Sequence, residues 1–261
     1  MNFMNFMNAE QQMALKVMVA RKLMSRPVGT AIAGIYRNRI PFDGMHIWTD
    51  EGSIHPSTKA ALFWGLYEKS ERRMIHAHLP RDVPVIELGA SIGGITNVIR
   101  RRVDDDKIVI SIEANPCLLP LIEKSLADNE QGRLIKILHG AISYGPGDTV
   151  PFAIDPISTN SKVAEDAGAD NVQHVPRLTL ARIIREQGLD RYSIVCDIEG
   201  AEHEVVAQDF AAFCNAGTVI IELHDTPSGH RKEELIRKIT AAGRMTLVDR
   251  DGNVCVFSSE A

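Results

Sequence analysis

Short apolar runs alternate with longer segments of helical spacing along most of this chain. From residue 85 onward each run ends in a polar residue or glycine, and apolar side chains then recur every three or four positions. Parallel strands need helical crossovers of this kind. The pattern therefore predicts a doubly wound α/β sheet with helices on both faces, with a first strand that begins at Val85 and further strands at 107–112, 134–138, 192–196 and 218–223.

The last part of the chain has a different pattern. Two further apolar runs, at 245–248 and 254–257, flank the sequence D-G-N at 251–253. Asp-Gly between strand-like runs is typical of a tight antiparallel hairpin. The sheet is therefore expected to be mostly parallel, with an antiparallel hairpin at its C-terminal end.

The N-terminal part does not follow this alternation. Residues 1–24 are rich in Met and helix-forming, and Pro27 is expected to end or kink that segment. Residues 37–55 predict short strands around a D-G turn, and residues 57–78 predict helix with a break around Gly65. No Ser/Gly-rich linker follows, so we expect a helical and β extension (1–80) packed on the core, and a main domain (81–261).

Composition and net charge disfavour some classes of function for this chain. The 261 residues include 44% apolar side chains, enough for a sizeable core. A net charge of −5 provides no overall basic field for nucleic acid. Four dispersed cysteines suggest neither a zinc knuckle nor a disulfide framework, and they fit the cytoplasm.

Nothing in the sequence predicts a membrane span or a leader. No apolar run approaches ~18 residues, and the N-terminal segment lacks the pattern of a signal peptide. The N-terminal helix is expected to pack on the main domain or on a second subunit, which leaves a homo-oligomer open. Contact of this basic amphipathic helix with a membrane surface is the alternative.

The stretch 85–94, V-I-E-L-G-A-S-I-G-G, has the layout of a first strand-to-helix turn in such a sheet. Its glycines let the backbone approach a ligand closely, and the helix start offers free N–H groups. The spacing is E-x-G-x-x-x-G and not the dinucleotide pattern G-x-G-x-x-G. In isolation these residues also fit an ordinary tight turn.

Ligands of open α/β sheets bind beyond the carboxyl ends of the strands. Glu113 ends the second strand, where an acid accepts hydrogen bonds from a ribose diol, or caps the next helix. Asn115 is expected to be the N-cap of that helix, with Pro116 as its first residue. Both NAD and S-adenosylmethionine carry a ribose, but S-adenosylmethionine has no phosphate, and its amino group suits the acid Glu87 beside the turn.

Two further strand ends carry possible catalytic groups. The sequence C-D-I-E-G-A-E-H-E begins at Cys196, and carboxylates after a buried strand are costly unless paired or used. Glu202 and Glu204 also fit acids that complement a helix dipole. I-E-L-H-D at 221–225 places His224 beside acids as a candidate general base, with a structural histidine as the alternative.

Together these motifs resemble the FkbM family of S-adenosylmethionine-dependent methyltransferases. The resemblance covers about residues 60–257 and includes L-Y-E at 66–68, V-I-E-L-G-A-S-I-G, I-E-A-N-P, H-G-A-I, D-I-E-G-A-E and I-E-L-H-D. D-I-E-G-A-E at 197–202 is the most specific of them. The resemblance implies a class I Rossmann-like methyltransferase with a seven-stranded sheet, which acts on hydroxyl oxygens of sugars, polysaccharides or polyketides.

The resemblance also implies a set of site residues. Those expected at the methionine end are Glu87, Gly89, Ala90, Ser91 and Gly93. Glu113 would hold the ribose, and those expected near the adenine are Ala114, Asn115 and Ala141. Ser91 replaces an Asn that is frequent in the family, and it is expected to keep a polar contact. Tyr67 and Glu68 would close over the cofactor or substrate, and Asp197 lies where cofactor and substrate meet.

We expect direct in-line methyl transfer to a small-molecule or glycan acceptor. Candidate bases are His224 and Asp197, then Glu199 and Glu222; a divalent ion on Asp197, Glu199 and Glu222 is an alternative, although no metal spacing is diagnostic. An NAD-dependent oxidoreductase and a non-catalytic binding protein are the competing functions. Residues 144–175, expected to be an irregular lid, substrate loop or disordered segment, and the N-terminal extension would select the acceptor.

Overall fold

The computed structural model describes residues 18–50, 52, 54–130, 134–154, 162–163, 171–226, 229–241 and 243–259. The chain divides into two compact units, Met1–Tyr67 and Glu68–Ala261. Helix α4 (Lys69–His78) belongs to the second unit, whereas the sequence analysis placed it in the extension. Packing of the extension on the main domain stays a prediction.

The first unit contains a helical segment at residues 18–23, followed by α2 (Arg26–Ile35), the hairpin of β1 (Arg39–Phe42) and β2 (Met45–Trp48), and α3 (Pro56–Phe63). The hairpin confirms the predicted D-G turn, because Asp43 and Gly44 have φ of 51° and 74°, as a type I′ turn requires. The helical segment at residues 18–23 breaks at residues 24–25, so it ends before Pro27 as expected. Pro27 itself lies in the first turn of α2, where a missing N–H costs nothing, and this second role was not predicted. Residues 1–17 of the predicted N-terminal helix lie outside the described residues.

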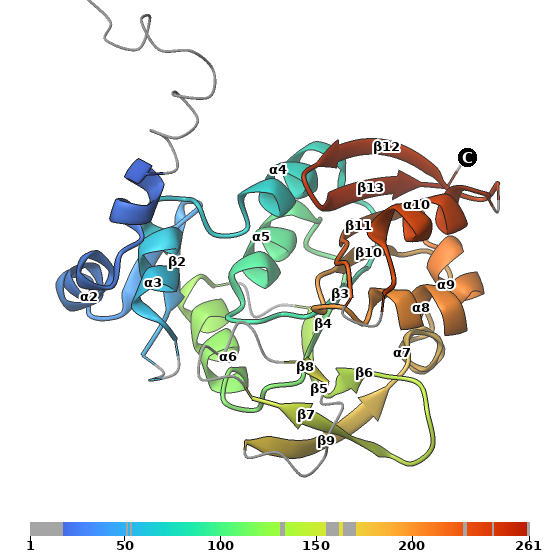
Figure 1. Cartoon of the computed structure of the whole chain (residues 1–261), viewed down its shortest axis with the longest axis horizontal. Coiled ribbons are helices and arrows are strands. Elements are labelled where there is room, and N and C mark those ends of the chain that lie inside the picture. The colour runs from blue at the N-terminus through green and yellow to red at the C-terminus, as the bar shows by residue number, and fades with distance from the viewer. Residues whose placement is uncertain are drawn as a thin grey trace, which may run out of the picture. The chain divides into compact units, whose positions relative to one another are not determined.

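The second unit contains the predicted seven-stranded sheet (Figure 1). Its strands are β3 (Val85–Leu88), β4 (Val109–Glu113), β5 (Ile135–His139), β10 (Ser193–Cys196), β11 (Thr218–Glu222), β12 (Thr246–Asp251) and β13 (Val254–Ser258). Their order is β12-β13-β11-β10-β3-β4-β5, and β13 runs antiparallel to both of its neighbours. From β3 the strands β4 and β5 are added on one side, whereas β10 and β11 are added on the other, so the strand order reverses between β3 and β10. A ligand site is expected at this switch point.

Helices cover both faces of this sheet (Figure 1). α4, α5 (Gly94–Arg102) and α6 (Leu119–Asp128) form one group, in which α4 contacts β11 and β13 and α5 contacts β4. The other group is α7 (Leu180–Gln187), α8 (Glu202–Gln208), α9 (Phe210–Cys214) and α10 (Lys232–Ala241). The short helix α9 was not among the predicted elements.

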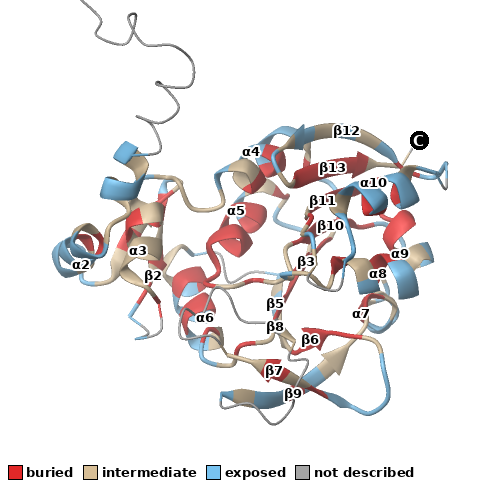
Figure 2. Cartoon of the chain, viewed as in Figure 1, coloured by how far each residue is buried: buried red, intermediate tan, exposed pale blue. Residues whose placement is uncertain are grey.

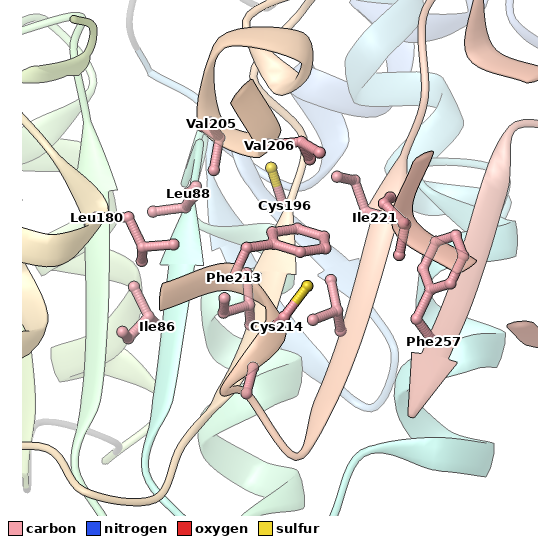
Figure 3. Packing of buried hydrophobic residues seen from close by; sticks show 14 of the residues in the cluster. Ile86, Leu88, Leu180, Cys196, Val205, Val206, Phe213, Cys214, Ile221 and Phe257 are labelled. Atoms are coloured by element: carbon pink, nitrogen blue, oxygen red, sulfur yellow. The ribbon is translucent and has the colours of Figure 1, made fainter. Parts of the chain in front are cut away.

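The core explains why the central strands are mostly apolar and do not alternate between apolar and polar residues. Ile86 and Leu88 on β3 lie in one cluster with residues of α7 to α10, while their neighbours Val85 and Glu87 are also buried. A strand buried on both faces needs no alternation with polar residues. Figure 3 shows the sheet residues Cys196 and Ile221 together with helix residues of this cluster, and Figure 2 shows that α5 is largely buried.

The expectation that residues 144–175 are irregular was wrong for the described part. A second sheet, ordered β6-β9-β7-β8, is formed by β6 (Ala141–Ile142), β7 (Thr149–Ala153), β8 (Lys162–Val163) and β9 (Val172–Leu178). Val150, Phe152 and Val175 form a small core with Ala141. Prolines within strands usually argue against a sheet, but Pro151 and Pro176 are accommodated here on β7 and β9.

Candidate active site

The turn after β3 lies at the switch point between β3 and β10, where the strand order reverses. Gly89 and Ala90 both donate their N–H to the carbonyl oxygen of Ile112, at 3.1 and 2.9 Å. Gly89 has φ of 93°, and a Cβ atom there would lie 1.9 Å from the carbonyl oxygen of Asp197. Only glycine fits this position. The turn is therefore held against the ends of both β4 and β10.

Glu113 at the end of β4 is fixed by two backbone amides. Its Oε2 accepts the N–H of Ser91 at 2.7 Å, and its Oε1 accepts the N–H of Asn115 at 2.6 Å. The side chain is buried, and this burial raises the pKa of Glu113 to about 7, although the amide hydrogen bonds favour the ionised form. Ser91 thus keeps a polar contact, but through its backbone. A carboxylate held in this way still has lone pairs for ribose hydroxyls.

The helix expected to start at Pro116 starts at Leu119 instead. Asn115 does not cap it: the side-chain Oδ1 accepts the N–H of Cys117 at 3.1 Å, which makes a local turn before the helix. Its Nδ2 is buried and has no hydrogen-bond partner among the described residues. An unsatisfied buried donor beside Glu113 is a feature that a bound ligand can satisfy.

The other residues expected near the cofactor lie around this turn. Glu87 on β3 accepts a hydrogen bond from the Thr96 hydroxyl at 2.7 Å, its Oε1 has no partner among the described residues, and burial raises its pKa to about 7. Gly93 is the N-cap of α5, with φ of 76°. Ala141 lies in the small core of the second sheet, against which Ala114 packs.

Beyond the turn, acidic side chains from three elements gather. Oxygen atoms of Glu68, Asp197 and Glu222 all lie within 4.8 Å of one another, and so do ligand atoms of Asp197, Glu202 and His224. Burial and the charges of Glu68, Glu222 and Glu199 raise the pKa of Asp197 well above its ordinary value, while His224 lowers it. We call these six residues, Glu68, Asp197, Glu199, Glu202, Glu222 and His224, the acidic cluster.

His224 is the positively charged member of the acidic cluster. Its Nδ1 lies 3.0 Å from Oε1 of the fully buried Glu202, and its Nε2 lies 3.8 Å from oxygens of both Glu199 and Glu222. The hydrogen bond to Glu202 is the largest cause that raises the pKa of His224 to about 9, against the effect of burial. Glu202 begins α8 but bonds to His224, so it is more than a charge at a helix terminus.

Glu68 immediately precedes α4 with φ of 42°, and Glu199 has φ of 51°, which are uncommon values for residues with a side chain. Burial, together with Glu222 and Glu199, raises the pKa of Glu68 to about 7. One turn along α4, Glu71 is also buried, and burial together with Asp197 and Glu68 raises its pKa well above the ordinary value.

Glu71, in the first turn of α4 just after Glu68, was not among the predicted site residues. The sequence also left open whether Glu202 acts in the site or only complements a helix dipole. Tyr67 ends the first unit, where its ring meets Phe42 edge-on at 5.9 Å. Asp225 follows His224 but is exposed, and it accepts the N–H of Lys232 at the start of α10. The acidic cluster therefore ends at His224.

A sequence profile described as the methyltransferase FkbM domain matches residues 87–245, which is more than half of the chain. The chain belongs to this family. It is therefore an S-adenosylmethionine-dependent methyltransferase, which confirms the expected family, cofactor and enzyme class. The competing NAD-dependent oxidoreductase is set aside. A comparison with curated proteins finds no match.

Solved structures similar to this FkbM methyltransferase are distant. A methyltransferase from Geobacter sulfurreducens is 14% identical, covers 91% of this chain and 90% of its own, and has a TM-score of 0.44. Aeropyrum pernix fibrillarin in complex with S-adenosylmethionine is 12% identical, with 74% of each chain covered and a TM-score of 0.42. At these values neither likeness carries an argument about the acceptor.

The residues around the turn fit S-adenosylmethionine. Glu113 offers acceptor oxygens for a ribose, and the Nδ2 of Asn115, which has no partner among the described residues, offers a buried donor. None of the helices in the described part of this FkbM methyltransferase has the length and apolarity needed to cross a membrane.

Proposed function

We propose that this FkbM methyltransferase methylates a hydroxyl oxygen of a small-molecule, sugar, glycan or polyketide-type acceptor. The observation that carries the proposal is the position of the acidic cluster. Asp197 belongs to this cluster, and its own carbonyl oxygen lies against Gly89 of the cofactor turn. A hydroxyl is a poor nucleophile until it loses its proton, and this cluster offers several proton acceptors where the methyl group would be delivered.

Different strand ends would bind different parts of S-adenosylmethionine. Glu113 would hold the ribose, and the methionine end would lie along the turn from Gly89 to Gly93, beside Glu87. The side chains that would lie near the adenine are Ala114, Asn115 and Ala141. S-adenosylmethionine supplies a methyl group that is already activated on a sulfonium, so the protein mainly aligns the acceptor and excludes water.

The transfer itself involves three bonds. The acceptor O–H bond breaks, an O–CH3 bond forms, and the C–S bond breaks with its electrons left on sulfur. We propose that the proton passes to Asp197 first, with Glu199 and Glu222 as the next candidates. His224, whose pKa is raised to about 9 beside Glu202, accepts a proton only when its imidazole is neutral. Asp197 is favoured by its Oδ1, which is buried and has no hydrogen-bond partner among the described residues.

A carboxylate-rich acceptor site also disfavours nucleic acid. Phosphates of DNA or RNA would meet the like charges of the acidic cluster, and the chain has a net charge of −5. Acceptor choice is proposed to depend on the second sheet, since Ala141 of its core lies beside the expected adenine site, and on the N-terminal unit. We keep the cytoplasm as the proposed location.

Mass spectrometry with S-adenosylmethionine that carries a deuterated methyl group tests the proposal. The acceptor panel contains sugars, nucleotide sugars, glycans and small alcohols, and fragmentation places the label on oxygen, nitrogen or carbon. We expect one labelled methyl group on oxygen. Label found only on nitrogen or carbon would overturn O-methylation.

Variants then test the roles of individual residues. Asp197→Asn is expected to lower transfer by about 10²-fold or more, as is typical when a general base is lost, while S-adenosylhomocysteine still binds. His224→Ala, which removes the positive charge beside these carboxylates, is also expected to lower transfer. Glu186→Gln on the exposed face of α7 is the matched control. Unchanged transfer in both cluster variants would remove these residues from the mechanism.

A further inference from the structure

The acidic cluster contains more negative charge than its histidine can balance. Glu68, Asp197 and Glu222 come from the start of α4 and the ends of β10 and β11, and their oxygens lie within 4.8 Å of one another. His224 lies 3.8 Å from Glu222, and its close hydrogen bond is with Glu202 instead. Like charges at this separation repel strongly in a partly buried site.

A second observation points to a ligand in the cluster. Glu202 is 0% exposed, and its Oε2 has no hydrogen-bond partner among the described residues; the same is true of the buried Oδ1 of Asp197. These two side chains and His224 have ligand atoms within 4.8 Å of one another. A buried carboxylate oxygen without a hydrogen bond or a cation destabilises the folded protein, so each of these oxygens is expected to have a partner.

We infer that the acidic cluster binds a divalent cation, with Glu68, Asp197 and Glu222 as its ligands. Three carboxylates are the donor set that suits a hard cation such as Mg²⁺ or Mn²⁺. The geometry replaces Glu199, which the sequence suggested as a ligand, with Glu68: among the described residues Glu199 is in neither group of close ligand atoms.

Asp197 is shared by both groups, so a cation there would relieve the repulsion between Glu68 and Glu222 and give the Asp197 carboxylate a partner. The Glu202–His224 pair would remain beside it, hydrogen-bonded as it is now. A bound cation would also lower the pKa of a coordinated acceptor hydroxyl; this consequence alone rests on the proposed function.

Titration of the full-length protein with Mn²⁺, followed by electron paramagnetic resonance of the free ion, tests the inference in the presence of S-adenosylhomocysteine. We expect one Mn²⁺ per chain, displaced by excess Mg²⁺. Asp197→Asn and Glu222→Gln should each weaken Mn²⁺ binding at least ~10-fold, since even outer-shell changes cost that much at metal sites. Glu186→Gln should bind Mn²⁺ like the wild type.

Thermal melting without metal shows whether the variants are folded. Because each cluster variant removes a like charge, we expect a melting temperature equal to or above that of the wild type. Absence of Mn²⁺ binding to the wild type, or equal binding to folded Asp197→Asn, overturns the cation site. If methyl transfer persists in a chelator and no Mn²⁺ binds, the cation site is refuted and the O-methyltransferase proposal stands. If Mn²⁺ binds but no hydroxyl is methylated, the O-methyltransferase proposal is refuted and the cation site stands.

Discussion

Gly89 offers the sharpest test of how the turn is built. Replacement by alanine places a Cβ atom 1.9 Å from the carbonyl oxygen of Asp197, far below the 3.0 Å that such contacts essentially never breach. That oxygen cannot move away easily, because Asp197 donates its own N–H to Leu88 at 2.9 Å. Gly89→Ala therefore forces β3 and β10 apart at the cofactor site.

The magnitude follows from two separate costs. A side chain at left-handed φ costs about 1–2 kcal/mol, and Gly89 has φ of 93°. Overpacking of a rigid site adds about 1–3 kcal/mol, so we expect a loss of about 2–5 kcal/mol. Gly252 has φ of 64° and open space around it, so Gly252→Ala isolates the first cost alone.

Urea unfolding of wild type, Gly89→Ala and Gly252→Ala measures both losses, provided that the slopes agree. We expect Gly89→Ala to be less stable than Gly252→Ala by about 1–3 kcal/mol, and to bind S-adenosylhomocysteine more weakly. Equal stability of the two variants would refute the close packing of the turn against β10.

Three other predictions concern Glu113 and the core. Glu113→Gln should weaken binding of S-adenosylhomocysteine about 10- to 100-fold by calorimetry, since hydrogen bonds to a charged group contribute about 1.5–3 kcal/mol; unchanged affinity would contradict its role at the ribose. The pKa of Glu113 rises from 4.5 to about 7 on folding, so the stability it contributes to the ligand-free protein is full below pH 4.5 and is lost as the pH rises through 7. Glu113→Gln should abolish that part of the decline in melting temperature between pH 5 and 8, and a parallel decline in both proteins would argue against it. Phe213→Ala removes a 0% exposed ring and should cost about 3–5 kcal/mol in urea unfolding; a loss below 1 kcal/mol would be inconsistent with the packing in Figure 3.

The main sheet could be predicted because its central strands are mostly apolar and its helices are periodic. Runs such as 85–88 and 218–222 are buried on both faces, and the loops that follow them carry the polar residues of the site. The convergence of Glu113, Asp197 and His224 then follows from parallel topology alone, since carboxyl ends of parallel strands share one edge.

Other features depend on contacts that a single sequence does not reveal. One helix ends at residue 23 and the next, α2, has Pro27 in its first turn, and only the helix end was predicted. The second sheet has prolines at positions 151 and 176, which local rules exclude from strands, and its small core includes Ala141 from before the segment. Glu71 and Glu202 look like ordinary helix acids until the fold brings them to Asp197 and His224.

The most direct test is a crystal structure of the full-length protein with S-adenosylhomocysteine. The account predicts the ribose hydroxyls on Glu113, the methionine end along the turn from Gly89 to Gly93, and the sulfur facing Asp197 in the acidic cluster. A ribose bound away from Glu113, or a sulfur that points away from the acidic cluster, would contradict it.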